Sequence, residues 1–182
     1  MAHVAVTAVG TDRPGIVAAV TRVFVDQGCN LEDSSMTILR GQFAMMLVVD
    51  APAGVEADAL ESALAEPASA LDLVVSVRAL ADVDVAGTPS AAAGGSWSVS
   101  VYGADHPGIV HGVADLLAGE GVNITNLSTR VIGGPDRPVY AMLLEVTLPP
   151  HVDPEALGRR LAAAAAELGV DASLHLADAD IL

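Results

Sequence analysis

Two short loops in this 182-residue chain carry residues whose types and spacing suit the binding of a small charged molecule. The first loop is Gly10–Gly15, with the sequence GTDRPG, and it joins an expected strand to an expected helix that begins near Ile16. The free N–H groups at a helix start favour a carboxylate. Asp12 offers a partner for an ammonium group. An anion acceptor beside a cation acceptor matches a free α-amino acid.

The same loop also has an ordinary structural interpretation. An Asp ahead of Pro-Gly is common at helix starts, and we expect Asp12 at or just before the N-cap. Pro14 suits the first helical turn because its missing N–H is no loss there. Gly10 permits a sharp turn or a close approach, and Gly15 leaves bare backbone at the helix start. The loop alone leaves both interpretations open.

The loop occurs twice in the chain. The second copy is Gly103–Gly108, with the sequence GADHPG, at an offset of 93 residues. Over residues 10–35, ten of 26 positions are identical to their counterparts, and Asn30 matches Asn123. Each Asn follows the first helix of its copy and offers an amide that both donates and accepts. The offset later becomes 97 through a four-residue insertion around 134–138, which we expect to form a turn.

Each copy predicts the element order βαββαβ. In the first copy, alternating apolar residues predict a strand before the loop, and Ile16, Val20 and Phe24 recur at helical spacing. We expect Gly28 and Gly121 to end the first helix of each copy. Strands follow at about 30–40, 42–50 and 72–79, with a helix near 55–66. Short connections and right-handed crossovers favour a four-stranded antiparallel sheet with both helices on one face.

The predicted class is therefore α+β, with two ferredoxin-like units. Their expected limits are residues 1–82 and 96–182. The segment 83–95 is rich in Gly, Ala, Ser and Pro and lacks periodicity, which is typical of a flexible linker.

Composition excludes several classes of function. The formal net charge is -15 and the chain contains no lysine, so binding to nucleic acid or to an anionic membrane surface is not expected. Schiff-base chemistry and a Walker-type phosphate lysine are excluded as well. A single cysteine allows no intrachain disulfide. We find no signal peptide and no run long enough to span a membrane, which predicts a cytoplasmic protein.

Other reactive side chains have structural explanations. His106 and His111 lie five residues apart on different faces of a helix, so no metal site is expected. Cys29 corresponds to Val122 in the second copy, which favours a packed apolar residue. Glu32 and Asp33 are neighbours on a strand, point to opposite faces and are interpreted as surface charge.

Three methionines lie on expected strands. Met45 and Met46, like Met142, are expected to fill the cores of their units rather than to bind a cofactor.

The form G-x-D-x-P-G-I-V, followed by G-x-N at the second strand, resembles the ACT domain. The two copies together resemble the tandem-ACT family of glycine cleavage system transcriptional repressors. The resemblance implies side-by-side pairing of domains, with amino acids bound at the pair interface. In the serine-responsive ACT domain of phosphoglycerate dehydrogenase, the ligand contacts match Asp12 and Asn30, or Asp105 and Asn123. That dehydrogenase has Asn in place of these Asp residues and His in place of Gly10 and Gly103, so serine itself is not implied.

The resemblance implies an amino-acid-sensing regulatory protein with no catalytic residue and no cofactor. It would act through a protein partner, form a homodimer and take a glycine- or serine-like ligand. The alternative is a ligand-free ACT module used for dimerisation or assembly. The implied ligand-binding residues are Gly10, Asp12, Arg13, Pro14, Gly15, Ile16 and Asn30, with Gly103, Asp105, His106, Pro107, Gly108, Ile109 and Asn123 in the second copy.

Overall fold

The computed structural model describes residues 2–81, 95–132 and 138–177. The chain divides into two compact units, Met1–Thr88 and Pro89–Leu182. Apart from Gly95, the predicted linker lies outside the described residues. The same holds for the inserted turn around 134–138, apart from Pro138.

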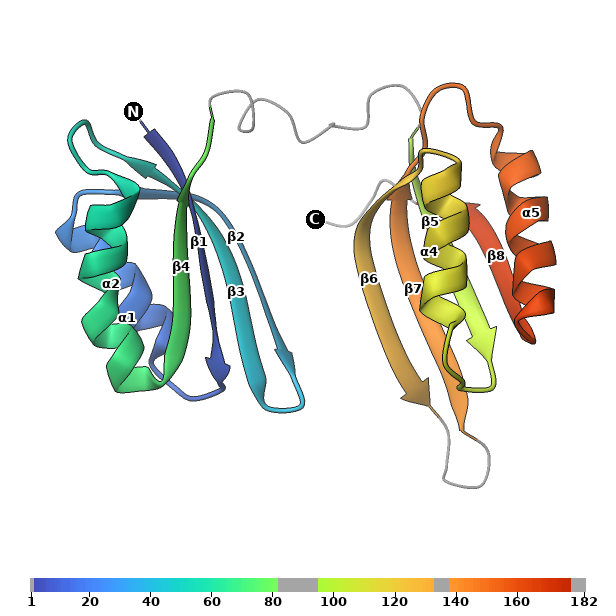
Figure 1. Ribbon diagram of the computed structural model, residues 1–182, viewed down its shortest axis with the longest axis horizontal. Coiled ribbons are helices and arrows are strands. Elements are labelled where there is room, and N and C mark those ends of the chain that lie inside the picture. Colours follow the sequence, from blue (N-terminus) through green and yellow to red (C-terminus); the bar gives the residue numbers. More distant parts are fainter. Residues whose placement is uncertain (1, 82–94, 133–137, 178–182) are drawn as a thin grey trace. The chain divides into compact units, whose positions relative to one another are not determined.

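Both units follow the predicted order βαββαβ (Figure 1). The first contains β1 (Ala2–Thr11), α1 (Ile16–Asp26), β2 (Asn30–Leu39), β3 (Gln42–Ala51), α2 (Ala57–Leu71) and β4 (Leu73–Ala79). The second contains β5 (Ser96–Gly103), α4 (Ile109–Gly119), β6 (Asn123–Ile132), β7 (Val139–Thr147), α5 (Pro154–Glu167) and β8 (Val170–Leu176).

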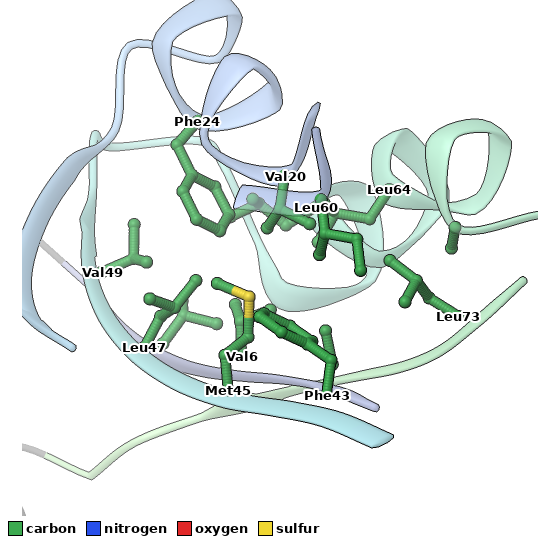
Figure 2. Close-up of a cluster of buried hydrophobic side chains, with 14 of the residues drawn as sticks. Val6, Val20, Phe24, Phe43, Met45, Leu47, Val49, Leu60, Leu64 and Leu73 are labelled. Atoms are coloured by element: carbon green, nitrogen blue, oxygen red, sulfur yellow. The ribbon is translucent and has the colours of Figure 1, made fainter. Parts of the chain in front are cut away.

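Each unit has one four-stranded antiparallel sheet, in the order β2-β3-β1-β4 or β6-β7-β5-β8. Val4 and Val6 alternate along β1 and are both buried. Val6 lies in one cluster with Phe24 of α1 and Leu64 of α2 (Figure 2). Both helices therefore cover the same face, because both supply side chains to that cluster. The predicted ferredoxin-like α+β class is confirmed, and among the described residues of each unit no helix of that unit lies on the opposite face of its sheet.

The strand register decides which methionines lie in the core. Met45 and Met142 are buried, as predicted. Met46 is 56% exposed, because it is the next residue along β3 and its side chain points to the helix-free face. The prediction that Met46 fills the core was wrong for that reason.

The first helix of each unit ends where the sequence predicts, whereas the second helix of the first unit ends later than predicted. Gly28 and Gly121 follow α1 and α4 with φ angles of 69° and 70°, so they end these helices as predicted. The second helix of the first unit runs to Leu71, beyond the predicted end near 66, and includes Pro67. Ala68 is buried, so the last turn continues the apolar face of α2.

Candidate functional site

The repeated loop begins its helix later than predicted. Gly15 and Gly108 are the N-cap residues of α1 and α4, with φ angles of 99° and 102°. Such left-handed backbone interrupts the helix, so Pro14 lies in the preceding turn and not in the first helical turn. Asp12 lies three residues ahead of the N-cap and makes no cap hydrogen bond. The predicted positions of Pro14 and Asp12 were therefore wrong.

The two glycines of the loop have different physical roles. A Cβ built on Gly15 meets nothing within 4 Å, so its positive φ, and not crowding, requires glycine there. A Cβ on Gly10 would lie 2.6 Å from the Asp72 carbonyl oxygen, and one on Gly103 would lie 2.5 Å from Val170 Cγ1. Gly10 and Gly103 therefore let the start of the last strand of their own unit approach closely.

The acidic side chain of each loop is exposed. The backbone N–H of Asp12 donates to the Gly41 carbonyl at 2.9 Å, which ties the loop to the β2–β3 hairpin. The Asp12 carboxylate accepts no hydrogen bond within the described residues. In the second unit, burial raises the pKa of Tyr140, and the nearby charge of Asp105 raises it further. The negative charge at this loop is available to a cation.

Two residues of the implied site point into the core. Ile16 and Ile109 are each 2% exposed, on the first turn of α1 and α4. Their side chains anchor the helix start, and only their backbone groups face the loop.

The structure separates the loop from the Asn of the same unit. Asn30 pairs with Asp50, which in turn pairs with His3 near the start of β1. Gly10 lies seven residues further along that strand, a separation of about 24 Å at roughly 3.4 Å per residue. Asn123 is related to Gly103 in the same way, through Thr147 and Ser96. One amino acid cannot contact both groups of a single unit.

The second loop differs from the first at one side chain. His106 Nε2 lies 2.6 Å from the Leu168 carbonyl oxygen, and Nδ1 lies 3.0 Å from that of Pro107. These bonds, first the one to Pro107 and then the one to Leu168, raise the pKa of His106. Its counterpart Arg13 is exposed and makes no such bond within the described residues. The implied ligand contact His106 is thus occupied by its own chain.

Sequence reasoning missed a polar group near Asn30. His3 Nε2 pairs with Glu32 Oε2 at 3.2 Å. A β-bulge between Leu31 and Asp33 breaks the alternation of faces on which the interpretation of Glu32 as plain surface charge rested. Nothing in the spacing of the sequence places His3 against Glu32.

Cys29 packs against the core, as predicted. Burial raises the pKa of its thiol, and the charge of Asp50 adds to this. The thiol stays protonated near neutral pH and is a poor nucleophile.

A shallow groove of about 110 Å³ runs between α1 and β2. Leu31 and Met36 line it from the strand and Val17 from the helix, and all three are partly exposed. β2 is an edge strand, so no second strand among residues 2–81 pairs with its outer backbone groups. This side of the unit presents both apolar surface and an open sheet edge.

No group of three or more His, Cys, Asp or Glu side chains within the described ranges is arranged to hold a metal ion. None of the helices described is long and apolar enough to cross a membrane.

Two ACT-domain family models match the chain, one over residues 2–78 and the other over residues 97–164. The chain belongs to the ACT-domain family and carries two such domains in tandem. It is 25% identical to the glycine cleavage system transcriptional repressor of Escherichia coli over 176 residues, which is 96% of this chain and 90% of that protein. These matches place it among non-enzymatic regulatory proteins.

Two other proteins are similar to the chain. A 50-residue stretch is 48% identical to a UPF0237 protein of Methanopyrus kandleri, and it covers 28% of this chain and 56% of that protein. A crystal structure of a protein from Galdieria sulphuraria has a TM-score of 0.75 and 28% identity, and covers 97% of this chain and 99% of that one.

Proposed function

We propose that this chain is an amino-acid sensor that binds its ligand at the Gly10–Gly15 and Gly103–Gly108 loops. The observation that carries this proposal is the repeated arrangement of an exposed Asp beside a helix whose N-cap is a glycine. Because Gly15 and Gly108 have no side chain to cap the helix, the first N–H groups of α1 and α4 are left for a ligand carboxylate. Asp12 or Asp105 takes the ammonium group.

The separation of loop and Asn makes the site depend on pairing. A free amino acid is much shorter than the distance of about 24 Å between Gly10 and Asn30 along one sheet. The loop of one protomer and Asn30 of the partner subunit must therefore meet, if both contact one ligand. We propose a homodimer for this reason.

The groove between α1 and β2 is the surface we propose for that pairing. An edge strand with exposed Leu31, Met36 and Ile38 is suited to pair with the same strand of a second copy, which would satisfy its backbone and cover its apolar side chains.

The acidic surface favours a protein partner over nucleic acid. With a net charge of -15, the chain is repelled by the phosphate backbone. We propose that it regulates glycine cleavage or amino-acid metabolism in the cytoplasm by contacting a regulator or enzyme. Its similarity to a glycine cleavage repressor supports this proposal. We also propose domains at 1–82 and 96–182 joined by a linker at 83–95, where limited proteolysis should cut first.

Thermal unfolding with each of the twenty amino acids tests the sensing function. At a ligand concentration about 100 times Kd, the stabilisation is roughly 2.7 kcal/mol, which raises Tm by roughly 5–10 °C for a chain of this size. The double variant Asp12→Ala and Asp105→Ala should fold normally and lose this shift.

Asp153→Ala is the matched control. Asp153 caps α5 by accepting hydrogen bonds from the N–H groups of Glu155 and Ala156 at 3.2 Å, so its loss lowers stability but leaves the ligand shift intact. If no amino acid changes the Tm of the wild-type protein, the sensing function is wrong. The exposed edge of β2 then favours the alternative, an ACT module used for dimerisation or assembly.

A further inference from the structure

His106 joins two segments that are 62 residues apart in the chain. One ring nitrogen lies 2.6 Å from the carbonyl oxygen of Leu168, and the other lies 3.0 Å from that of Pro107. A carbonyl only accepts hydrogen bonds, and a neutral imidazole has one N–H. Both bonds can therefore form together only when the ring carries its second proton.

The end of α5 is a favourable place for that positive charge. Leu168 is the C-cap residue of α5, where the carbonyls without helical partners carry a partial negative charge. The same residue is also fixed from α4, because a Cβ on Gly112 would lie 2.8 Å from Leu168 Cδ1. The turn after α5 is thus held at Leu168 from two sides. The side chain of Leu168 packs against α4, and its backbone carbonyl bonds to His106 of the second loop.

The first unit lacks this connection. Arg13 stands at the position of His106 and Leu71 at that of Leu168, and no hydrogen bond joins them within residues 2–81. A guanidinium does not change its charge at ordinary pH. Only the second loop can respond to protons in this way.

Few other titratable groups act on the ring. Asp105 on the same loop favours the charged form. On β7, Tyr140 interacts with Asp105. Glu167 and Asp171 flank the α5–β8 turn in sequence, and His111 follows on α4. Three of these five groups are carboxylates that favour a cation, so none of the three opposes the protonated ring.

We propose that His106 is a positioning residue that holds the Gly103–Gly108 loop against the end of α5 most firmly when it is protonated, because only the charged ring donates to both carbonyls, and that neutralisation removes one of the two bonds and loosens the loop. As a regulation of the second ligand site, this inference rests on the proposed function. This pH-dependent contact of His106 with Leu168 and Pro107, which we call the latch, is measurable without any ligand. The consequence is that the two repeats are unequal sites, and only the second one depends on pH.

Amide hydrogen exchange and NMR titration of the ligand-free, full-length protein test the latch. The Gly112 N–H bonds to Gly108, and the Gly169 N–H bonds to Ala166, so both amides report on the segments that the ring joins. Between about pH 5.5 and about pH 8, the range in which histidine changes charge, their protection factors should fall about tenfold. The first-unit counterparts, Ala19 and Asp72, should not change.

Two variants sharpen the result. A glutamine side chain does not change its charge with pH, so His106→Gln should abolish the pH dependence of protection at Gly112 and Gly169. His151→Gln removes an exposed histidine elsewhere in the unit and should preserve it. Trp97 fluorescence reports that each variant is folded.

Three outcomes would overturn the latch. The His106 ring could titrate at or below its ordinary pKa, the pH dependence could persist in His106→Gln, or Ala19 and Asp72 could change as much as Gly112 and Gly169. A protein that shows the latch but binds no amino acid refutes the proposed function alone. A protein that binds an amino acid at the second loop equally at both pH values, with the latch present, refutes the regulatory role.

Discussion

Replacing Gly103 by alanine tests whether this loop glycine is needed for close packing. The new Cβ would lie 2.5 Å from Val170 Cγ1, 2.9 Å from its Cβ and 3.0 Å from its Cα. Adding a methyl group to a packed site costs about 1–3 kcal/mol. Alanine also restricts the unfolded chain, which offsets about 0.4–1 kcal/mol. The net loss for Gly103→Ala is therefore about 1–2 kcal/mol.

Urea unfolding followed by fluorescence measures this loss in the second unit alone. Trp97 is the only tryptophan of the chain and lies on β5, so its signal reports on the unit that contains Gly103. With a slope of about 2 kcal/mol per molar urea, the midpoint should fall by about 0.5–1 M.

The matched control is Gly119→Ala. Gly119 ends α4 and a Cβ there meets nothing within 4 Å, so the substitution should leave the midpoint unchanged or raise it slightly. A second variant, Val170→Ala on the Gly103→Ala background, removes the nearest methyl group and should recover part of the loss. If Gly103→Ala unfolds at the wild-type midpoint, the packing argument is wrong.

Three further predictions concern the loop, the pairing surface and pH. Gly108→Ala should cost about 1–2 kcal/mol in the same assay although its site is open, because φ is 102°, and Gly108→Asn should cost less. Met36→Glu should convert a dimer to a monomer in light scattering without lowering Tm by more than a few degrees, because Met36 is 52% exposed in each unpaired copy. The pKa of His106 is raised on folding. The protonated ring therefore stabilises the second unit fully below the unfolded-state pKa, and this contribution is lost as pH rises through the folded-state pKa. Between about pH 5.5 and about pH 8, the free energy of unfolding followed by Trp97 fluorescence should fall more in wild type than in His106→Gln.

The order of elements was predictable because it depends on local periodicity. Alternation in β1 and helical spacing in α1 are properties of neighbouring residues, and the repeat at an offset of 93 confirmed that both copies share one pattern. The ends of α1 and α4 were predictable for the same reason, since Gly28 and Gly121 supply the left-handed backbone that ends a helix. The start of these helices was misplaced, because a glycine does not show in advance which φ it adopts.

The sequence suggests which residues form the candidate site but not how they are arranged. The Asp12 loop and Asn30 follow from the motif, whereas their separation follows from strand register, which is fixed by pairing over the whole sheet. The contact of His3 with Glu32 depends on a bulge, and that of His106 with Leu168 on how the last helix of the unit packs.

By itself, the sequence determined that this protein has two similar α+β units, an acidic surface without lysine and a repeated Asp-x-Pro-Gly loop at a helix start. These properties depend on composition and on residues close together in the chain. Only the tertiary structure decided that Gly10 and Gly103 are packing residues, that the loop and the Asn of one unit lie at opposite ends of a sheet, and that His106 ties the second loop to α5. The physical reason is that each of these depends on atoms brought together from distant parts of the chain, whose positions no local pattern specifies.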